Sequence, residues 1–224
     1  MDTSKKLSIA SAAAAALLFA LCAMTLASGV SQQWFEWVRP PSEYAARLVR
    51  DAAWLRAIIA VDDVFIASYV TATVLLANVL ARGELGVVHV LVIAGGVAAG
   101  VLDLAENHHI LAMLRVAESG EAIPLGEILH RSGASQLKWM LGHLSFALVG
   151  VALPARDAMT RAFRASLVAW QLPIGALYWT LDAWLPLLTW LRYGSLFAGF
   201  AAIAWLTRGG ARADAAAVGS SARA

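Results

Sequence analysis

Residues 87–115 read VVHVLVIAGGVAAGVLDLAENHHILAMLR and join a long apolar run to a group of polar side chains. The first part, 87–102, carries no charged residue. A helix that crosses the hydrocarbon core of a bilayer needs about 20 residues. Asp103, Glu106 and Asn107 therefore lie within or at the edge of the hydrocarbon, where a central charge costs about 2.5–3.5 kcal/mol. A structural or a functional role must offset that cost.

The composition of the chain is that of an integral membrane protein. Hydrophobic residues make up 60% and charged residues only 14% of the 224 positions, whereas a soluble domain has about 25% charged residues. The apolar residues fall in long blocks, which predict an all-α, polytopic integral membrane helical bundle with about six transmembrane helices. The expected spans lie near 7–27, 52–80, 87–114, 136–153, 165–181 and 184–206, within one domain, 1–208. The tail, 209–224, is rich in Gly, Ala and Ser, which predicts a disordered cytoplasmic segment.

The apolar block at 7–27 has two interpretations. Lys5 and Lys6 precede it and small residues end it, as in a cleaved signal peptide. Its 21 residues exceed the typical signal core of about 7–15 residues and are enough to cross a bilayer. A retained span is therefore the favoured interpretation.

Polar segments separate the predicted spans. From Glu43 onward, the stretch before the second span is expected to form a short amphipathic helix at the membrane interface. The stretch 115–135 is expected to be a polar loop between the third and fourth spans. The last two spans are expected to separate where Asp182 lies near a helix end and Pro186 suits the first turn of the next helix.

The distribution of Lys and Arg predicts the orientation in the membrane. With six spans both termini lie on one side of the membrane. The segments on that side contain nine Lys and Arg residues, and the loops on the opposite side contain five. The positive-inside rule then puts both termini in the cytoplasm. Abundant Ala and a preference for Arg over Lys are typical of a GC-rich bacterium, so the predicted location is a bacterial inner membrane. In this orientation the charged residues inside the spans all lie toward the outer leaflet.

Charge, cysteine content and motifs exclude several classes of protein. The formal net charge is +2, which leaves no basic face for nucleic acid. Cys22 is the single cysteine, so the chain forms no internal disulfide. The sequence contains no phosphate-binding loop, nucleophile elbow, dinucleotide fingerprint or HExxH zinc motif. The expected partners are the lipid bilayer and an amphiphilic or lipid ligand.

One face of the third predicted span collects small and polar residues. Gly96, Gly100, Asp103 and Asn107 follow a 4-3-4 spacing and share this face. Small residues four positions apart let the backbone of a neighbouring helix approach closely. We therefore expect the polar side chains on this face to point into the bundle and away from lipid.

Several ionisable side chains are candidates for a working site. The candidates for catalysis or ion binding are Asp103, Glu106, Asp62, Asp63 and Lys138, and those for holding a substrate are Asn107, Arg56, His143 and Arg192. Two carboxylates one helical turn apart do not both ionise easily in a low dielectric unless a cation lies between them. One of them then keeps its proton, as a general acid or proton carrier requires. The structural alternative is a buried ion pair of Asp103 or Glu106 with Lys138, Arg56 or Arg192.

A divalent metal ion is the only cofactor that the pattern suggests. His109 follows Glu106 by three residues, which is the spacing of Glu-x-x-His metal ligands in helical bundles. A single copy is a weak signal, and the site would need Asp62, Asp63 or His143 as a further ligand.

Three classes of function fit these observations. The first is an enzyme that acts on a lipid-like or isoprenoid substrate entering from the outer leaflet, with Asp103 or Glu106 as acid or base. The second is a small proton- or cation-coupled transporter, and the third is a structural or assembly subunit of a membrane complex. The charges lie on one side of the membrane, which favours a one-sided site, and hence the enzyme, over a path through the bilayer.

Overall fold

Six α-helices and one 3₁₀ helix make up the described part of the chain in the computed structural model. They are α1 (Thr3–Ser28), η1 (Gln32–Glu36), α2 (Pro41–Ala81), α3 (Val87–Glu118), α4 (Leu125–Ala152), α5 (Ala158–Thr180) and α6 (Leu185–Ser221). The structure describes residues 2–81, 83–154, 157–181 and 184–221, with side chains as far as position 207. The predicted all-α fold is confirmed.

The helices have the length and composition of a polytopic membrane bundle. Four of them, α1, α2, α3 and the part of α6 from Leu185 to Thr207, are long and apolar enough to cross a membrane. The other two, α4 with 28 residues and α5 with 23, are also long enough. They are more polar, and α4 packs along α3 while α5 packs along α4.

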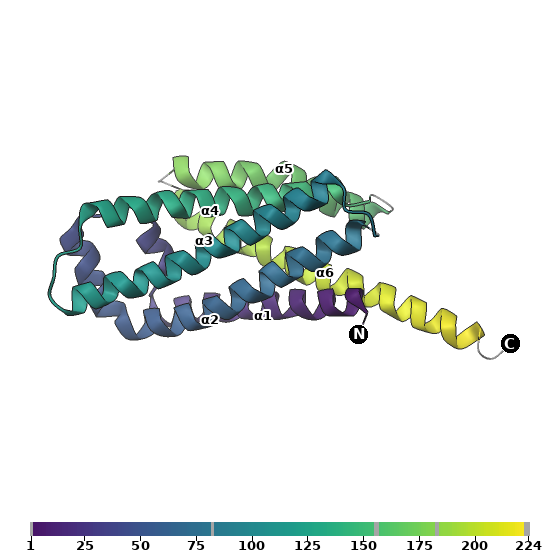
Figure 1. Cartoon of the computed structure of the whole chain (residues 1–224), viewed down its shortest axis with the longest axis horizontal. Helices are drawn as coiled ribbons and strands as arrows, with labels where there is room; N and C mark the ends of the chain where they lie inside the picture. The colour runs from purple at the N-terminus through teal and green to yellow at the C-terminus, as the bar shows by residue number, and fades with distance from the viewer. Residues whose placement is uncertain (1, 82, 155–156, 182–183, 222–224) are drawn as a thin grey trace.

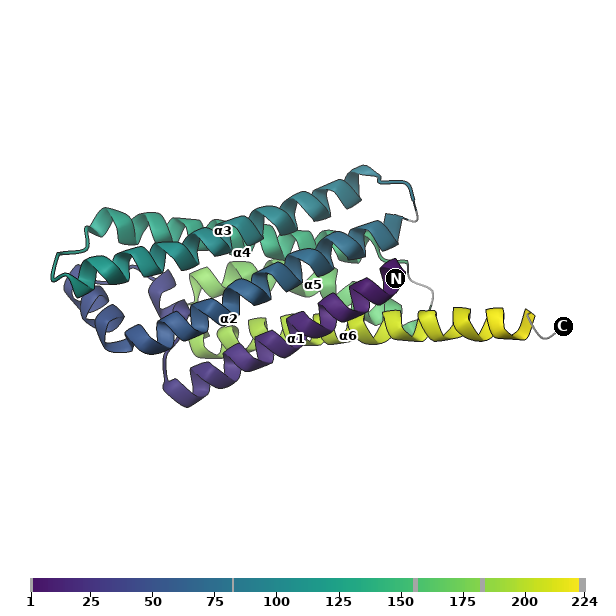
Figure 2. The same cartoon turned by 60° about the horizontal axis from the view of Figure 1, so that its bottom comes forward.

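The helices follow one another around a ring (Figures 1 and 2). Each helix from α1 to α5 packs on the next one, and α6 returns to pack along α1. The contact between α5 and α6 is much smaller than the others. Both termini lie at the same end of the bundle, and the last part of α6 extends beyond it (Figure 1).

Helix α1 is part of the core. Leu7, Ser11, Ala14 and Leu18 are buried at 4-3-4 spacing on one side of α1. This side faces α2 and α6, with which α1 makes its helix–helix contacts. The first apolar block therefore packs as a retained span would.

The small-residue face of α3 packs against α2, as its spacing predicts. A Cβ atom added at Gly96 would lie 2.6 Å from Thr73 Cγ2. Two turns further along α3, Asp103 Oδ2 accepts a hydrogen bond from the Tyr69 hydroxyl of α2 at 3.2 Å. Since Asn107 on the same face also binds α2, the close approach brings the polar groups of both helices together.

Two of the predicted connections are wrong. The stretch from Glu43 is not a separate interfacial helix, because α2 runs unbroken from Pro41 and buries Tyr44 and Leu48 in line with the rest of its inner face. The predicted loop 115–135 is mostly helical, and only 119–124 separates α3 from α4. Both stretches bury polar side chains, so hydropathy alone does not reveal their inner faces.

The predicted break between the last two spans lies where the structure separates α5 from α6. Helix α5 ends at Thr180, and α6 begins at Leu185 with Pro186 in its first turn. Asp182 lies outside the described residues. The backbone of α6 is helical as far as Ser221, and the disorder expected for the tail, 209–224, stays a prediction.

Candidate functional site

Lys138 binds carboxylates from two other segments. Its ammonium lies 2.9 Å from Asp103 Oδ1 on α3 and 3.6 Å from Glu36 Oε1 on η1, and it also donates to Glu106 Oε2. Ser135, one turn earlier on α4, donates to the other oxygen of Glu106. Lys138 is 8% exposed and Glu106 is 4% exposed. Three acids therefore share one cation in a buried cluster, as the structural alternative anticipated for Lys138.

Residues 31–37, here called the strap, contain η1 and lie between α1 and α2. The guanidinium of Arg131 on α4 holds the strap to the bundle. It donates from Nε to the Phe35 carbonyl at 3.0 Å and from Nη1 to the Glu106 carbonyl at 2.9 Å. Arg131 is only 2% exposed, so the connection between the strap and α3 runs through a buried charge.

Glu36 is the residue of the strap that contacts the buried cluster. It is 2% exposed and accepts a hydrogen bond from Trp139 Nε1 at 3.0 Å. Arg192 of α6 is fully buried, with Nη2 at 3.6 Å from Glu36 Oε2. The Arg192 guanidinium carbon lies 3.4 Å from the centre of the Trp139 ring and 3.6 Å from that of Tyr178. Since its nitrogens make no hydrogen bond to the described residues, the aromatic faces supply much of its stabilisation.

Asp62 and Asp63 lie beside this cluster without a basic partner. Asn107 Nδ2 donates to Asp62 Oδ2 at 2.9 Å and to Asp63 Oδ1 at 2.8 Å, and Gln32 Nε2 of the strap donates to Asn107 Oδ1 at 2.9 Å. No Lys, Arg or His among the described residues forms an ion pair with either aspartate. The amide of Asn107 therefore links both acids to the strap.

His143 faces a different helix from Lys138. Its Nδ1 lies 2.9 Å from Gln171 Oε1 on α5, and its ring stacks on Trp139 with the centres 5.8 Å apart. The neighbouring residue on α5 is Gly175, where an added Cβ would lie 2.7 Å from His143 Cδ2. His143 thus joins α4 to α5 and does not contact the carboxylates.

Two further predicted site residues, Arg56 and His109, form ion pairs away from the buried polar groups. Arg56 binds Glu118 with Nη2 to Oε2 at 2.7 Å, and both side chains are exposed. His109 Nε2 lies 3.0 Å from Glu127 Oε2 near the connection from α3 to α4. Among the residues that the structure describes, no three His, Cys, Asp or Glu side chains are grouped as metal ligands. The hypothesis of a metal at His109 gains no support from this geometry.

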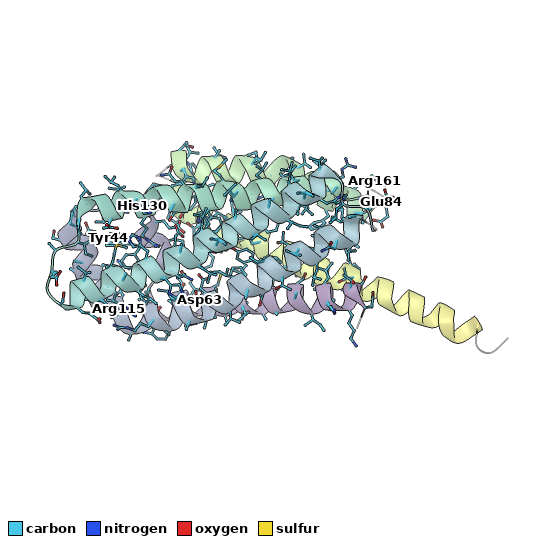
Figure 3. The ribbon with its side chains drawn as sticks, viewed as in Figure 1. Tyr44, Asp63, Glu84, Arg115, His130 and Arg161 are labelled. Atoms are coloured by element: carbon cyan, nitrogen blue, oxygen red, sulfur yellow. The ribbon has the colours of Figure 1, made fainter. Side chains whose placement is uncertain are left out.

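The polar groups lie between the two ends of the bundle. Figure 3 shows Asp63 part of the way along it, with Arg115 and His130 toward one end and Glu84 and Arg161 toward the end that holds the termini. Several described stretches carry no Asp, Glu, Lys or Arg: 7–28, 64–81, 87–102, 139–152, 165–180 and 193–207. On α3 this uncharged stretch is about 24 Å long, which is most of the hydrocarbon thickness.

Several cavities adjoin the charged groups. One of about 240 Å³ is lined by Glu106, Arg131 and Glu127. A second, of about 230 Å³, lies between α1, the strap, α2 and α6, and Asp62 is the one charged residue that lines it in the described part of the chain. A smaller cavity of about 60 Å³ lies inside the ring, next to Asp103, Lys138 and His143. Neither Asp63 nor Arg192 lines the second cavity.

Sequence reasoning missed two residues of the cluster, Glu36 and Arg131. Both stand in polar stretches outside the predicted spans, where an acid or an arginine ordinarily faces water. The only signal for Glu36 is the run of aromatic residues around it, Trp34, Phe35 and Trp37. For Arg131 the signal is the 3-4 spacing that it shares with Ile128 and Ser135, which are also buried.

These features define a multi-span helical membrane protein whose bundle encloses a network of charged side chains. Comparison of the chain with models of protein families, with curated proteins and with solved structures finds no match. The function of the protein must therefore be inferred from the geometry of the network and its cavities.

Proposed function

We propose that the protein takes an amphiphile from the bilayer into the cavity between α1, α2 and α6 and acts on it there as an enzyme. The observation that carries this proposal is Asp62, a carboxylate that is 8% exposed, has no basic partner among the described residues and lines a cavity of about 230 Å³. A cavity with mostly apolar walls and a few polar groups is the usual form of a ligand site. A buried acid at its wall suits proton transfer to or from a ligand.

The geometry favours Asp62 over Asp103 and Glu106 as the working acid. The carboxylates of both residues accept hydrogen bonds from the Lys138 ammonium, and Glu106 also accepts one from Ser135. Groups that are held in this way serve to fix helix positions. Asp62 has one oxygen bound by Asn107, so its orientation is fixed while it faces the cavity.

The distribution of charge supports a one-sided site. The described stretches toward the termini lack Asp, Glu, Lys and Arg over about 24 Å of α3, and a coupled carrier needs polar groups along its path. The second candidate, a structural or assembly subunit, is favoured by the Lys138 cluster, because its contacts join the strap, α3 and α4.

The proposed location is a bacterial inner membrane with both termini in the cytoplasm and the strap toward the outer leaflet. The termini share one end of the bundle (Figure 1), and Lys and Arg are more numerous there. Because Arg131 belongs to the buried cluster, the count becomes nine against four in favour of this orientation. The packing of α1 on α2 and α6 supports retention of the first span.

The orientation predicts the behaviour of topology reporters. Alkaline phosphatase inserted after Gly120, between α3 and α4, is expected to be active when the protein is made in a bacterium, because this end faces the periplasm. A fluorescent protein fused to the C-terminus is expected to fold and fluoresce in the cytoplasm. An inactive phosphatase at Gly120 together with a dark C-terminal fusion would reverse the orientation.

A cavity-filling substitution tests the proposed ligand site. Thr25 lines the cavity on α1, so Thr25→Trp is expected to reduce the amount of lipid or isoprenoid that co-purifies with the protein by at least tenfold. Native mass spectrometry of the detergent-solubilised protein measures this amount. Thr71→Trp, at an exposed position on α2, is the matched control and is expected to retain the ligand.

Incubation of the protein with total membrane lipid separates the alternatives. A new lipid mass that requires the wild-type cavity supports the enzyme. Uptake of an amphiphile into proteoliposomes without conversion would favour the carrier. If the wild type and Thr25→Trp contain equal amounts of lipid and neither converts it, the structural or assembly subunit is the function that remains.

A further inference from the structure

We infer that the cavity between α1, the strap, α2 and α6 binds the ammonium group of an amphiphile, as in an ethanolamine head group or an alkylamine. The inference rests on the proposed function and names the class of its ligand. Among the described residues, Asp62 is the only charged group that lines the cavity. The other polar groups along its wall are neutral: amides, hydroxyls, the Cys22 thiol and the Trp190 indole. Any charge of the lining therefore comes from Asp62.

Asp62 lacks a counter-ion because each nearby cation is engaged elsewhere. Lys138 binds Asp103, Glu106 and Glu36. The two arginines of the network are also committed, Arg131 to two backbone carbonyls and Arg192 to Glu36 and aromatic rings.

A buried carboxylate without a counter-ion is costly, and a cationic ligand removes that cost. Asp62 is more than nine-tenths buried, and its only hydrogen bond within the described residues is the one from Asn107 to Oδ2. The second oxygen, Oδ1, therefore stays available to a donor from the ligand. An ammonium group supplies both the positive charge and the N–H donors.

The remaining walls of the cavity suit an alkylammonium ion. Phe65, Trp190 and Tyr193 line it, and aromatic rings attract ammonium groups through their π faces. Gln32 uses its Nε2 on Asn107, which leaves its carbonyl oxygen as an acceptor for an N–H of the ligand. Leu18, on α1, offers an apolar surface for the hydrocarbon chain.

The same walls do not suit an inorganic cation or an anion. Hard divalent ions need about six oxygen ligands, and the described lining holds a single carboxylate. An anionic group beside Asp62 would meet like charge and no basic side chain in the described lining. The chemistry that remains is an ammonium group on a molecule with an apolar tail.

The test compares three short-chain probes in thermal unfolding of the full chain in dodecyl maltoside, followed by intrinsic tryptophan fluorescence. The probes are dihexanoylphosphatidylethanolamine, dihexanoylphosphatidylglycerol and hexylamine. We expect the ethanolamine lipid or hexylamine to raise the melting temperature by about 5 °C near saturation, because each carries an ammonium group. Phosphatidylglycerol has the same chains and phosphate without the ammonium and is expected to produce no shift.

Two aspartate variants make the test specific for position. Asp62→Asn is expected to remove the shift, whereas Asp63→Asn, which loses an adjacent carboxylate that does not line the cavity, is expected to keep it. If Asp62→Asn does not fold, Trp190→Leu serves instead and is expected to reduce the affinity for hexylamine at least threefold. A shift that survives Asp62→Asn, or an affinity unchanged by Trp190→Leu, would overturn the inference.

The outcomes show which molecule supplies the ammonium group, and they separate failure of this inference from failure of the proposed function. A shift with the ethanolamine lipid alone identifies a lipid head group, and a shift with hexylamine alone identifies a free amine. If phosphatidylglycerol raises the melting temperature as much as the ethanolamine lipid does, and Thr25→Trp abolishes this rise, the cavity binds amphiphiles but does not recognise the ammonium group. If no probe shifts the melting temperature and Thr25→Trp retains the lipid of the wild type, the proposed function fails as well.

Discussion

Replacing Lys138 with methionine is expected to lower the free energy of unfolding by about 3–5 kcal/mol, because removal of one partner leaves buried charges uncompensated. The three acids that Lys138 serves, Glu36, Asp103 and Glu106, would then face one another. Glu106 and Glu36 are 4% and 2% exposed, so water cannot replace the ammonium without opening the bundle. Unfolding in mixed micelles of dodecyl maltoside and sodium dodecyl sulfate measures the change.

Arg56→Met is the matched control for the loss of Lys138. It removes a cation from an ion pair of similar length, with Glu118, whose two side chains are exposed. Exposed pairs contribute about 0–1 kcal/mol. Equal effects of Lys138→Met and Arg56→Met would mean that the Lys138 cluster contributes no more than a surface pair.

Replacing Arg131 with methionine is expected to cost about 3 kcal/mol and to release the strap. Arg131 provides the hydrogen bonds from Nε and Nη1 to the Phe35 and Glu106 carbonyls, and a hydrogen bond from a charged group contributes about 1.5–3 kcal/mol. Methionine fills a similar volume but leaves both carbonyls without these donors. Faster hydrogen exchange in residues 31–37, measured by mass spectrometry, is the expected sign of a released strap.

His130→Met separates this effect from a general disturbance of α4. His130 precedes Arg131 on the same helix, but its side chain is exposed. We expect its unfolding free energy to change by less than about 0.5 kcal/mol and the exchange of 31–37 to stay as in the wild type. Slow exchange of the strap in Arg131→Met would show that other contacts hold it.

The four most apolar helices, α1, α2, α3 and α6, could be predicted from the sequence because each has a long apolar block. The ends of the helices could not, since α2 begins in a stretch with many charged residues on its outer side and α4 in one where buried polar residues replace apolar ones. Over residues 125–135 of α4 the buried positions are Ile128, Arg131, Ser132 and Ser135, of which only the first is apolar. A prediction from hydropathy assigns such a stretch to a loop, although its buried residues have the 3-4 spacing of a helix.

The partners in the charged cluster were predictable only in part. The spacing on α3 correctly puts Asp103 and Asn107 toward the interior, and Lys138 is one of the three cations that the sequence offers to Asp103 and Glu106. The choice among those cations depends on which helices are neighbours, and the ring order makes α4 the neighbour of α3. Glu36 could not be predicted, because the strap enters the bundle through tertiary contacts and the run of aromatic residues around Glu36 does not specify them.

The order in which the cluster is completed matters when the protein is made. Lys138 follows Asp103 by 35 residues, and Asn107 follows Asp62 by 45. At a synthesis rate of about 5–20 residues per second, the acids of α2 and α3 exist for several seconds before these partners have been added. During that interval, the carboxylates must stay hydrated, or the entry of α3 into lipid must wait for α4. If α3 enters lipid together with α4, Lys138 accompanies the acids of α3, whereas Arg192 reaches Glu36 only when the last helix has been made.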